Sequence, residues 1–197
     1  ASDTAIIDNL GTEEVDVGSG ASVAILDATG TTLTFDASGS MTLDIDDAAV
    51  TALTVDLGSG ATLTFDQDVD TTVNAVPSLT QMTLTSSGNV TLAEDDAGAA
   101  LTASGVSKLD VSGVSGDFGT TNLNSAANAF DGLSEFKGAQ GADTINVTNS
   151  QGTFTLNAGN DTIAFTAMTA GVDVYGGAGR DTVTLQAGGT IADDVYF

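Results

Sequence analysis

Short runs of alternating apolar and polar residues recur along most of this chain. The clearest runs lie at residues 15–17, 23–26, 33–35, 41–45, 53–57, 63–65, 82–84 and 90–92, and most begin eight to twelve residues apart. Within them the two classes alternate, as in Leu33-Thr34-Phe35. This period of two predicts β-strands that are buried on one face. The gaps hold Gly, Ser, Asp and Ala, and the first three of these favour turns.

A longer repeat favours stacked coils. The segment at residues 15–21, Val-Asp-Val-Gly-Ser-Gly-Ala, returns at residues 55–61 with one change, forty residues later. Forty residues make two coils of about twenty, so we expect two strands per coil; insertions in a three-sided coil are the alternative. A sandwich of hairpins would also space strands in this way, but Asn-Gly and Asp-Gly turns are rare. We therefore predict an all-β fold, a right-handed parallel β-solenoid.

One phrase recurs three times near the C-terminal end. It reads Gly-Ala-Gln-Gly-Ala-Asp-Thr-Ile at 138–145, Leu-Asn-Ala-Gly-Asn-Asp-Thr-Ile at 156–163 and Gly-Gly-Ala-Gly-Arg-Asp-Thr-Val at 176–183. Each copy is a turn of small residues, then an Asp, then a short strand. Asp143, Asp161 and Asp181 are 161 − 143 = 18 and 181 − 161 = 20 residues apart. An 18-residue coil would place Asp143 directly below Asp161, and the two extra residues before Asp181 predict a looser loop at 167–171.

This phrase resembles the nonapeptide G-G-x-G-x-D-x-U-x of the RTX family of calcium-binding β-rolls. The Gly-, Thr- and Asp-rich composition is most similar to the surface-layer and adhesin-type members. The resemblance covers roughly a quarter of the chain. It implies a secreted protein at the bacterial cell surface, exported by type 1 secretion, in which Ca²⁺ ions lie between stacked loops.

The residue types in the loops suit calcium. Gly allows tight turns that expose carbonyls, Asp supplies carboxylate oxygens, and Ca²⁺ takes six to eight oxygen ligands. The predicted metal-binding residues are Gly138, Gly141, Asp143, Asn157, Gly159, Asp161, Gly176, Gly177, Gly179 and Asp181. The first two motif positions are both Gly only in the third copy, so we expect at most one ion between adjacent loops. The alternative is that these loops are metal-free turns of the solenoid.

Other aspartates form a second candidate site. Asp66, Asp68 and Asp70 make a dense cluster of aspartates, with a spacing that suits calcium but without the Gly and distal Glu of an EF-hand. Asp27, Asp36, Asp46, Asp56 and Asp66 follow successive strands at intervals of nine or ten residues, so alternate members would stack on one edge. The alternative is that Asp caps its own turn.

We expect one continuous solenoid with four parts. Residues 1–14 form a lead-in that caps the first coil or pairs with another subunit, and residues 15–121 form the N-terminal repeats. Residues 122–137 form an irregular or short helical insertion, where Phe130, Leu133 and Phe136 recur at helical spacing. Residues 138–197 form the RTX-like coils. No segment is apolar for long enough to suggest a transmembrane helix.

The charge excludes one class of partner and weakens others. The formal net charge is −24, from 27 acids against Lys108, Lys137 and Arg180. No basic patch can form, so we expect no nucleic acid partner. The chain has no Cys and no His, which removes thiolate chemistry and the usual general base. The expected partners are other copies, neighbouring domains of a longer chain, and a cell-surface polysaccharide.

These observations favour a structural protein over an enzyme. The first interpretation is a non-catalytic extracellular module that folds and self-assembles with calcium in a surface layer, adhesin or filament. The second is an ice-binding solenoid, because Thr-x-Thr recurs at 32–34, 62–64, 83–85 and 182–184. The third is a polysaccharide-acting β-helix enzyme, although only Arg180 lies near an acidic cluster as a candidate base.

Overall fold

The chain is built from parallel β-strands, as predicted. The computed structural model describes residues 4–10, 14–28, 32–45, 50–65, 79–94, 106–121, 132–147, 150–165, 168–185 and 195–196, which form strands and turns and no helix. The strands are β1 (Thr4–Leu10), β2 (Glu14–Val17), β3 (Ala21–Ala28), β4 (Thr32–Ala37), β5 (Met41–Ile45), β6 (Ala52–Leu57), β7 (Ala61–Phe65), β8 (Gln81–Ser86), β9 (Val90–Glu94), β10 (Lys108–Val114), β11 (Phe118–Thr121), β12 (Glu135–Lys137), β13 (Thr144–Val147), β14 (Ser150–Thr155), β15 (Thr162–Phe165), β16 (Met168–Tyr175), β17 (Thr182–Leu185) and β18 (Val195–Tyr196).

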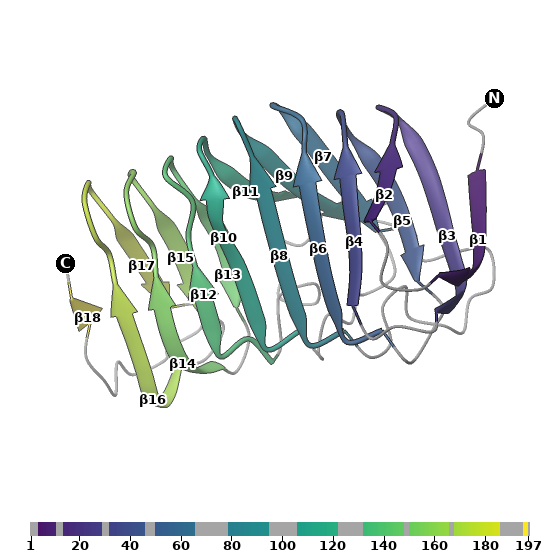
Figure 1. Cartoon of the computed structure of the whole chain (residues 1–197). Helices are drawn as coiled ribbons and strands as arrows, with labels where there is room; N and C mark the ends of the chain where they lie inside the picture. Colours follow the sequence, from purple (N-terminus) through teal and green to yellow (C-terminus); the bar gives the residue numbers. More distant parts are fainter. Residues whose placement is uncertain are drawn as a thin grey trace.

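Successive strands alternate between two faces of a stack. The even-numbered strands form the front sheet, in the order β18-β16-β14-β12-β10-β8-β6-β4-β2. The odd-numbered strands form two rear sheets, β1-β3-β5-β7-β9-β11 and β13-β15-β17, and β11 contacts β13 where they meet. The chain rises along the front sheet, crosses over, descends along the rear and advances toward the C-terminus, which makes the coil right-handed (Figure 1).

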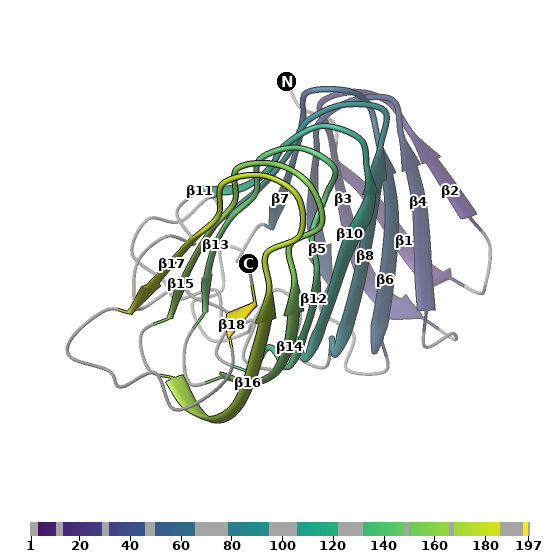
Figure 2. The same cartoon turned by 90° about the vertical axis from the view of Figure 1, so that its left-hand side faces the viewer.

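The pairing rules out hairpins among the described strands. Every ladder is parallel and joins strands that are two apart in the chain. Val15 pairs with Phe35 and Phe35 with Val55, so the forty-residue repeat spans two coils. The view along the axis shows the two faces enclosing a narrow interior, with the short loops between front and rear strands along one edge (Figure 2). The prediction of two strands per coil is confirmed.

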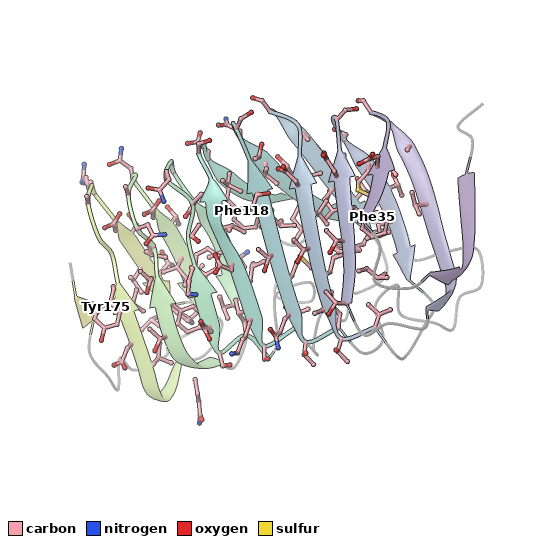
Figure 3. All side chains as sticks on the ribbon, in the orientation of Figure 1. Phe35, Phe118 and Tyr175 are labelled. Carbon is pink, nitrogen blue, oxygen red and sulfur yellow. The ribbon has the colours of Figure 1, made fainter. Side chains whose placement is uncertain are left out.

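The alternating pattern decides which side chains enter the interior. In β4 and β6 every second residue is buried, and Leu33, Phe35, Leu53 and Val55 are at most 1% exposed. A single coil cannot cover such a face, so each coil is stabilised by its neighbours. Phe35 and Phe118 lie among the side chains between the sheets (Figure 3). The eight strands predicted up to residue 92 are all present.

Glycines form the tight turns between front and rear strands. In the repeated Gly-Ser-Gly turns, Gly20 and Gly60 have φ of 76° and 74°. The N–H groups of Ala21 and Ala61 donate to the carbonyls three residues earlier, at 3.3 and 3.2 Å. A positive φ at the third position of such a turn is the geometry that favours Gly. This explains why the phrase at 15–21 is repeated at 55–61.

The structure revises three details of the predicted organisation. The lead-in contains β1, which pairs with β3 inside the rear sheet. The predicted insertion at 122–137 ends in a strand, because Glu135–Lys137 is β12 and pairs with β10 and β14; residues 122–131 lie outside the described ranges. The looser loop predicted at 167–171 is wrong for residues 168–171, which lie in β16. The two extra residues before Asp181 form an irregularity within this strand, where Ser150 pairs with Met168 but Gly152 pairs with Val172.

Candidate metal centre

The three predicted loops stack directly on one another. They connect the front strands β12, β14 and β16 to the rear strands β13, β15 and β17. Thr144 pairs with Thr162 and Thr162 with Thr182, so the aspartate before each of these threonines occupies the same position in three consecutive coils. The prediction that an 18-residue spacing places Asp143 and Asp161 one above the other is confirmed.

Each aspartate of this stack accepts a hydrogen bond from the preceding coil. The N–H of Phe118 donates to Oδ1 of Asp143 at 3.2 Å, and the N–H of Asp143 donates to Oδ1 of Asp161 at 2.8 Å. The N–H of Asp161 in turn donates to Oδ1 of Asp181 at 3.1 Å. The carboxylates therefore continue the inter-coil hydrogen bonding through the turn. We call Asp143, Asp161 and Asp181 the aspartate stack.

The second carboxylate oxygens differ in their surroundings. Asp143 and Asp161 are each 1% exposed. Oδ2 of Asp143 accepts the N–H of Ala139 at 2.7 Å, whereas Oδ2 of Asp161 has no hydrogen-bond partner among the described residues. A buried polar atom without a partner costs about 1–3 kcal/mol. Oδ2 of Asp161 is therefore the atom in this region that most needs a ligand.

Burial shifts the acidity of the stack. Burial raises the pKa of Asp143 to about 7; the N–H of Ala139 opposes this rise, and the nearby charge of Asp161 adds to it. Burial also raises the pKa of Asp161; the N–H of Asp143 opposes this rise, and the charge of Asp181 adds to it. Carboxylates in this arrangement repel one another, and a bound cation would favour their ionised forms.

Other atoms lie very close to the positions that a Cβ would take at two loop glycines. A Cβ on Gly138 would lie 2.3 Å from Oδ2 of Asp143, and a Cβ on Gly176 would lie 2.4 Å from Oδ2 of Asp181. At Gly138 a Cβ would also lie 2.4 Å from the carbonyl oxygen of Leu156, so Gly is required there, whereas at Gly176 it would meet only the side chain of Asp181. The equivalent position beside Asp161 is Leu156, which lies inside the core.

Other loop positions bring the backbones of neighbouring coils together. Gly159, Gly177 and Gly179 have φ of 136°, 91° and 138°, and Asn157 has φ of 71°, a left-handed geometry that Asn tolerates better than most residues. A Cβ on Gly159 would meet the carbonyl of Gly141 at 2.2 Å. The carbonyls of these loops thus point along the stack, and Gly138 O accepts the side-chain amide of Asn157.

A parallel ladder was missed by the sequence analysis. The N–H of Asp117 donates to Oδ1 of Asn89 at 2.9 Å, and the N–H of Ala142 donates to Oδ1 of Asp117 at 2.7 Å. Farther along, Arg180 N–H donates to Oδ1 of Asn160 at 2.9 Å. The available signal was an Asn or Asp directly after Gly and one or two residues before a strand. These side chains accept N–H groups from the next coil, unlike the local turn caps that the sequence analysis considered for Asp.

The aspartate stack offers a cation one unpartnered oxygen but does not form a complete coordination shell. Among the residues that the structure describes, no three carboxylates converge closely enough to hold a metal ion. Both oxygens of Asp143 accept N–H groups, yet each keeps a further lone pair, because a carboxylate offers about four acceptor sites. Oδ2 of Asp161 is buried and lacks a hydrogen-bond partner among the described residues. A cation here would take carboxylates from adjacent coils, one from each.

The second acidic set is only partly described. Asp66, Asp68 and Asp70 lie outside the described residues, as does Asp46. Asp36 and Asp56 do pair in register, and Asp16 precedes them in the same exposed row of the front sheet. Thr85 Oγ1 donates to Oδ1 of Asp56 at 2.8 Å. Exposed carboxylates in one row repel one another, and nothing in the row is enclosed.

The comparisons with known proteins assign no function to this chain, so only its geometry bears on function. Searches against family models, curated protein sequences and solved structures gave no significant match. Within the described ranges, no helix is long and apolar enough to cross a bilayer. The resemblance to RTX repeats therefore depends on the three loops themselves.

Proposed function

We propose that this protein is a non-catalytic structural module of the bacterial cell exterior, whose C-terminal coils order when they bind Ca²⁺. The observation that carries the proposal is Oδ2 of Asp161, an oxygen without a hydrogen-bond partner on a carboxylate that is 1% exposed. It lies in the middle of the aspartate stack, in a chain of net charge −24. A hard divalent cation is the ligand that meets both the charge and the missing partner.

The residues that would hold the ion come from adjacent coils. Asp161 would be the central ligand, and Asp143 and Asp181 would contribute from the coils on either side, with loop carbonyls completing the oxygen set. The ion would supply positive charge where the buried carboxylates repel one another. Because such ligands come together only in the folded coils, the free energy of binding adds to the free energy of folding.

The strands at the two ends of the stack support the proposal of self-assembly. Among the described strands, β1 and β2 stand at one end of the sheets and β17 and β18 at the other. Val17 at one end, and Val183 and Leu185 at the other, are only partly buried although they pack against the core. Unpaired strand edges with apolar neighbours favour addition of further strands. Other copies, or further coils of a longer chain, would stack on these edges.

The described residues support the two alternative functions less well. Thr34, Thr54 and Thr83 align across three front strands, as an ice-binding face would need, but the adjacent row of the same strands reads Asp36, Asp56 and Thr85. A thermal hysteresis assay would test that alternative. For the enzyme, Arg180 lies on an exposed loop, and assays of polysaccharide cleavage would test it.

The proposal is tested by returning calcium to chelator-treated protein. Circular dichroism and light scattering are recorded together as Ca²⁺ is added, with Mg²⁺ as the control ion because it demands a tighter octahedral site. We expect Ca²⁺ to increase the β-sheet signal and the particle size, and Mg²⁺ to have a weaker effect. If Ca²⁺ changes neither quantity, the loops are metal-free turns and the proposal fails.

A further inference from the structure

The outer face of the front sheet carries two ordered rows of side chains in its C-terminal half. They run across β8, β10, β12, β14 and β16, and each row takes one residue from each strand. The first row is Gln81, Lys108, Glu135, Thr153 and Asp173, and the second is Thr83, Asp110, Lys137, Thr155 and Tyr175. We call these ten residues the outer strip. Four strand spacings make it about 19 Å long.

Opposite charges alternate in the centre of the outer strip. Lys108 Nζ lies 3.4 Å from Glu135, and Lys137 Nζ lies 3.2 Å from Asp110 and 3.6 Å from Glu135. These two are the only lysines of the chain. The four charges cancel, so the centre of the strip is a locally neutral area on a strongly acidic protein, and Asp173 at the C-terminal end adds one negative charge. It offers ammonium donors and carboxylate acceptors side by side.

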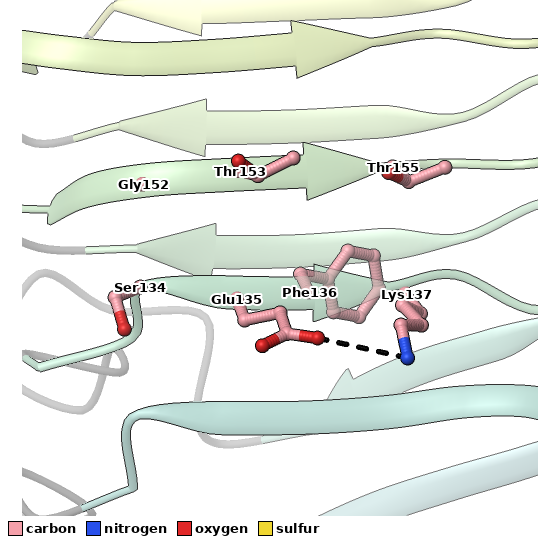
Figure 4. A pocket seen from close by; sticks show the side chains of 7 residues that line it. All are labelled: Ser134, Glu135, Phe136, Lys137, Gly152, Thr153 and Thr155. Carbon is pink, nitrogen blue, oxygen red and sulfur yellow. Dashed lines mark ion pairs between the residues drawn. The ribbon is translucent and has the colours of Figure 1, made fainter.

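The strip is hollowed on both sides of the short strand β12. One hollow, of about 340 Å³, lies toward β14 and is lined by Glu135, Lys137, Thr153 and Thr155, with Gly152 adding no side chain (Figure 4). A second, of about 190 Å³, lies toward β8 and β10. Glu135 and Lys137 line both hollows. The hollows therefore follow one another along the solenoid axis.

An exposed aromatic ring lies at the C-terminal end of the strip. Tyr175 is 41% exposed and is the large hydrophobic residue that stands out on the described surface. It is in register with Thr155, which is in register with Lys137. A Tyr side chain combines an apolar face with a polar tip. Such a ring can cover the apolar face of a sugar while its hydroxyl contacts water or polar groups.

We infer that the outer strip binds a linear neutral polysaccharide laid along the solenoid axis. Sugar hydroxyls both donate and accept, and the strip supplies carboxylate acceptors from Asp110 and Glu135 and donors from both lysines. The ring of Tyr175 provides the stacking surface. An anionic polymer is disfavoured because the rest of the chain repels it. A protein partner is disfavoured because the strip lacks the apolar centre typical of protein interfaces.

The exposed ion pairs of the outer strip do not prevent it from binding a polysaccharide. Pairs of this kind contribute little to stability, because water screens the charges and both side chains lose rotamer freedom. The side chains of Lys108 and Lys137 are 54% and 50% exposed. They can therefore re-orient toward ligand hydroxyls with little effect on the fold. This inference does not depend on calcium binding in the loops at the edge of the sheet.

Affinity electrophoresis tests the inference directly. The native chain is run through gels that contain dextran, laminarin, hydroxyethylcellulose or linear mannan, with hyaluronan as the anionic control. We expect at least one neutral polymer to retard the protein and hyaluronan to leave it unretarded. The Kd follows from the retardation at increasing polymer concentration.

Two variants in the strip and two controls decide where the polymer binds. Tyr175→Ala and Lys137→Met should each raise the Kd at least tenfold, while Tyr175→Phe, which keeps the ring, should stay within about threefold of the parent. Thr34→Ala changes the same face at β4, outside the strip, and should leave the Kd unchanged. Circular dichroism confirms that each variant is folded. Absence of retardation in all four neutral polymers, or equal retardation of Tyr175→Ala and Thr34→Ala, would overturn the inference.

Discussion

The backbone N–H of Asp143 donates a 2.8 Å hydrogen bond to Oδ1 of Asp161, one coil farther along the solenoid. Both side chains are buried, and the second oxygen of Asp161 has no partner among the described residues. Asp161 thus stabilises the turn below it through one carboxylate oxygen and keeps the other buried without a partner. This dual arrangement makes Asp161 the residue at which folding and calcium binding can be separated.

Asp161→Asn should remove most of the effect of calcium on stability. Asn keeps an oxygen for the N–H of Asp143 but removes the negative charge. In chelator, the variant should be as stable as the parent or more stable, because a repelling buried charge is gone. In millimolar Ca²⁺ it should lose most of the stabilisation that the parent gains. Thermal melts of both proteins in each condition measure this.

The control for Asp161→Asn is Asp36→Asn, in the exposed row of the front sheet. It removes one charge of the same sign without touching the aspartate stack. If both variants respond to calcium as the parent does, Asp161 is not a ligand, and the proposed site is wrong.

Stability without calcium should rise as the pH falls from 8 to 5. The folded state holds the pKa of Asp143 at about 7, above the ordinary value of 3.8, so folded Asp143 binds a proton more readily than the unfolded chain does. Between about pH 4 and 7 the unfolded chain releases this proton while folded Asp143 keeps it. The free energy of unfolding therefore falls as the pH rises through this range, and the loss is complete above 7. The slope is at most about 1.4 kcal/mol per pH unit for this residue.

Thermal melts in chelator at successive pH values measure this dependence. Asp161 adds to it, because its pKa is also raised. The comparison protein is Asp143→Asn, which loses one of two backbone hydrogen bonds and is less stable, but whose pH slope should be shallower. A parent protein whose stability falls steadily from pH 8 to 5 would contradict the raised pKa values of the two buried aspartates.

Gly179→Ala should disrupt the last described loop. Its φ is 138°, and a Cβ there would lie 1.5 Å from the carbonyl oxygen of Gly159 in the coil below. The backbone strain alone costs about 1–3 kcal/mol, and the clash forces the two loops apart as well. We expect loss of calcium response together with a lower unfolding midpoint in urea.

Gly171→Ala is the matched control for Gly179→Ala. Gly171 also has a positive φ, 95°, but a Cβ there would meet nothing within 4 Å. It should therefore show the strain without the clash and retain calcium binding. Equal losses in the two variants would mean that loop stacking contributes nothing beyond backbone strain.

Phe136→Ala should weaken the junction between the N-terminal and C-terminal coils. Phe136 is fully buried on the three-residue strand β12, and its ring lies 6.3 Å from that of Phe118. Deleting a buried Phe side chain costs about 3–5 kcal/mol. Urea unfolding followed by circular dichroism measures the loss, and Thr153→Ala on the exposed face of β14 should change stability by less than about 0.5 kcal/mol. A loss of that small size for Phe136→Ala would show that the junction is not packed as described.

The local pattern of the sequence determined the eight strands from residue 15 to 92 and the number of strands per coil. Alternation of apolar and polar residues selects the buried face of each strand, and the repeat from 15–21 to 55–61 indicates two strands per coil because forty residues equal two coils of about twenty. The 18-residue spacing likewise placed Asp143 below Asp161. These features depend on residues that are near in sequence or on a single coil length.

Only the tertiary structure decided which groups meet between coils. Consecutive outward residues Thr54, Thr83, Asp110 and Lys137 differ by 29, 27 and 27 positions, whereas Lys137 and Thr155 differ by 18. No local period specifies such unequal coils, because the register depends on how the loops are accommodated. The pairing of Lys108 with Glu135, the bulge in β16 and the unpartnered oxygen of Asp161 all follow from that register, so they became visible only when the coils were stacked.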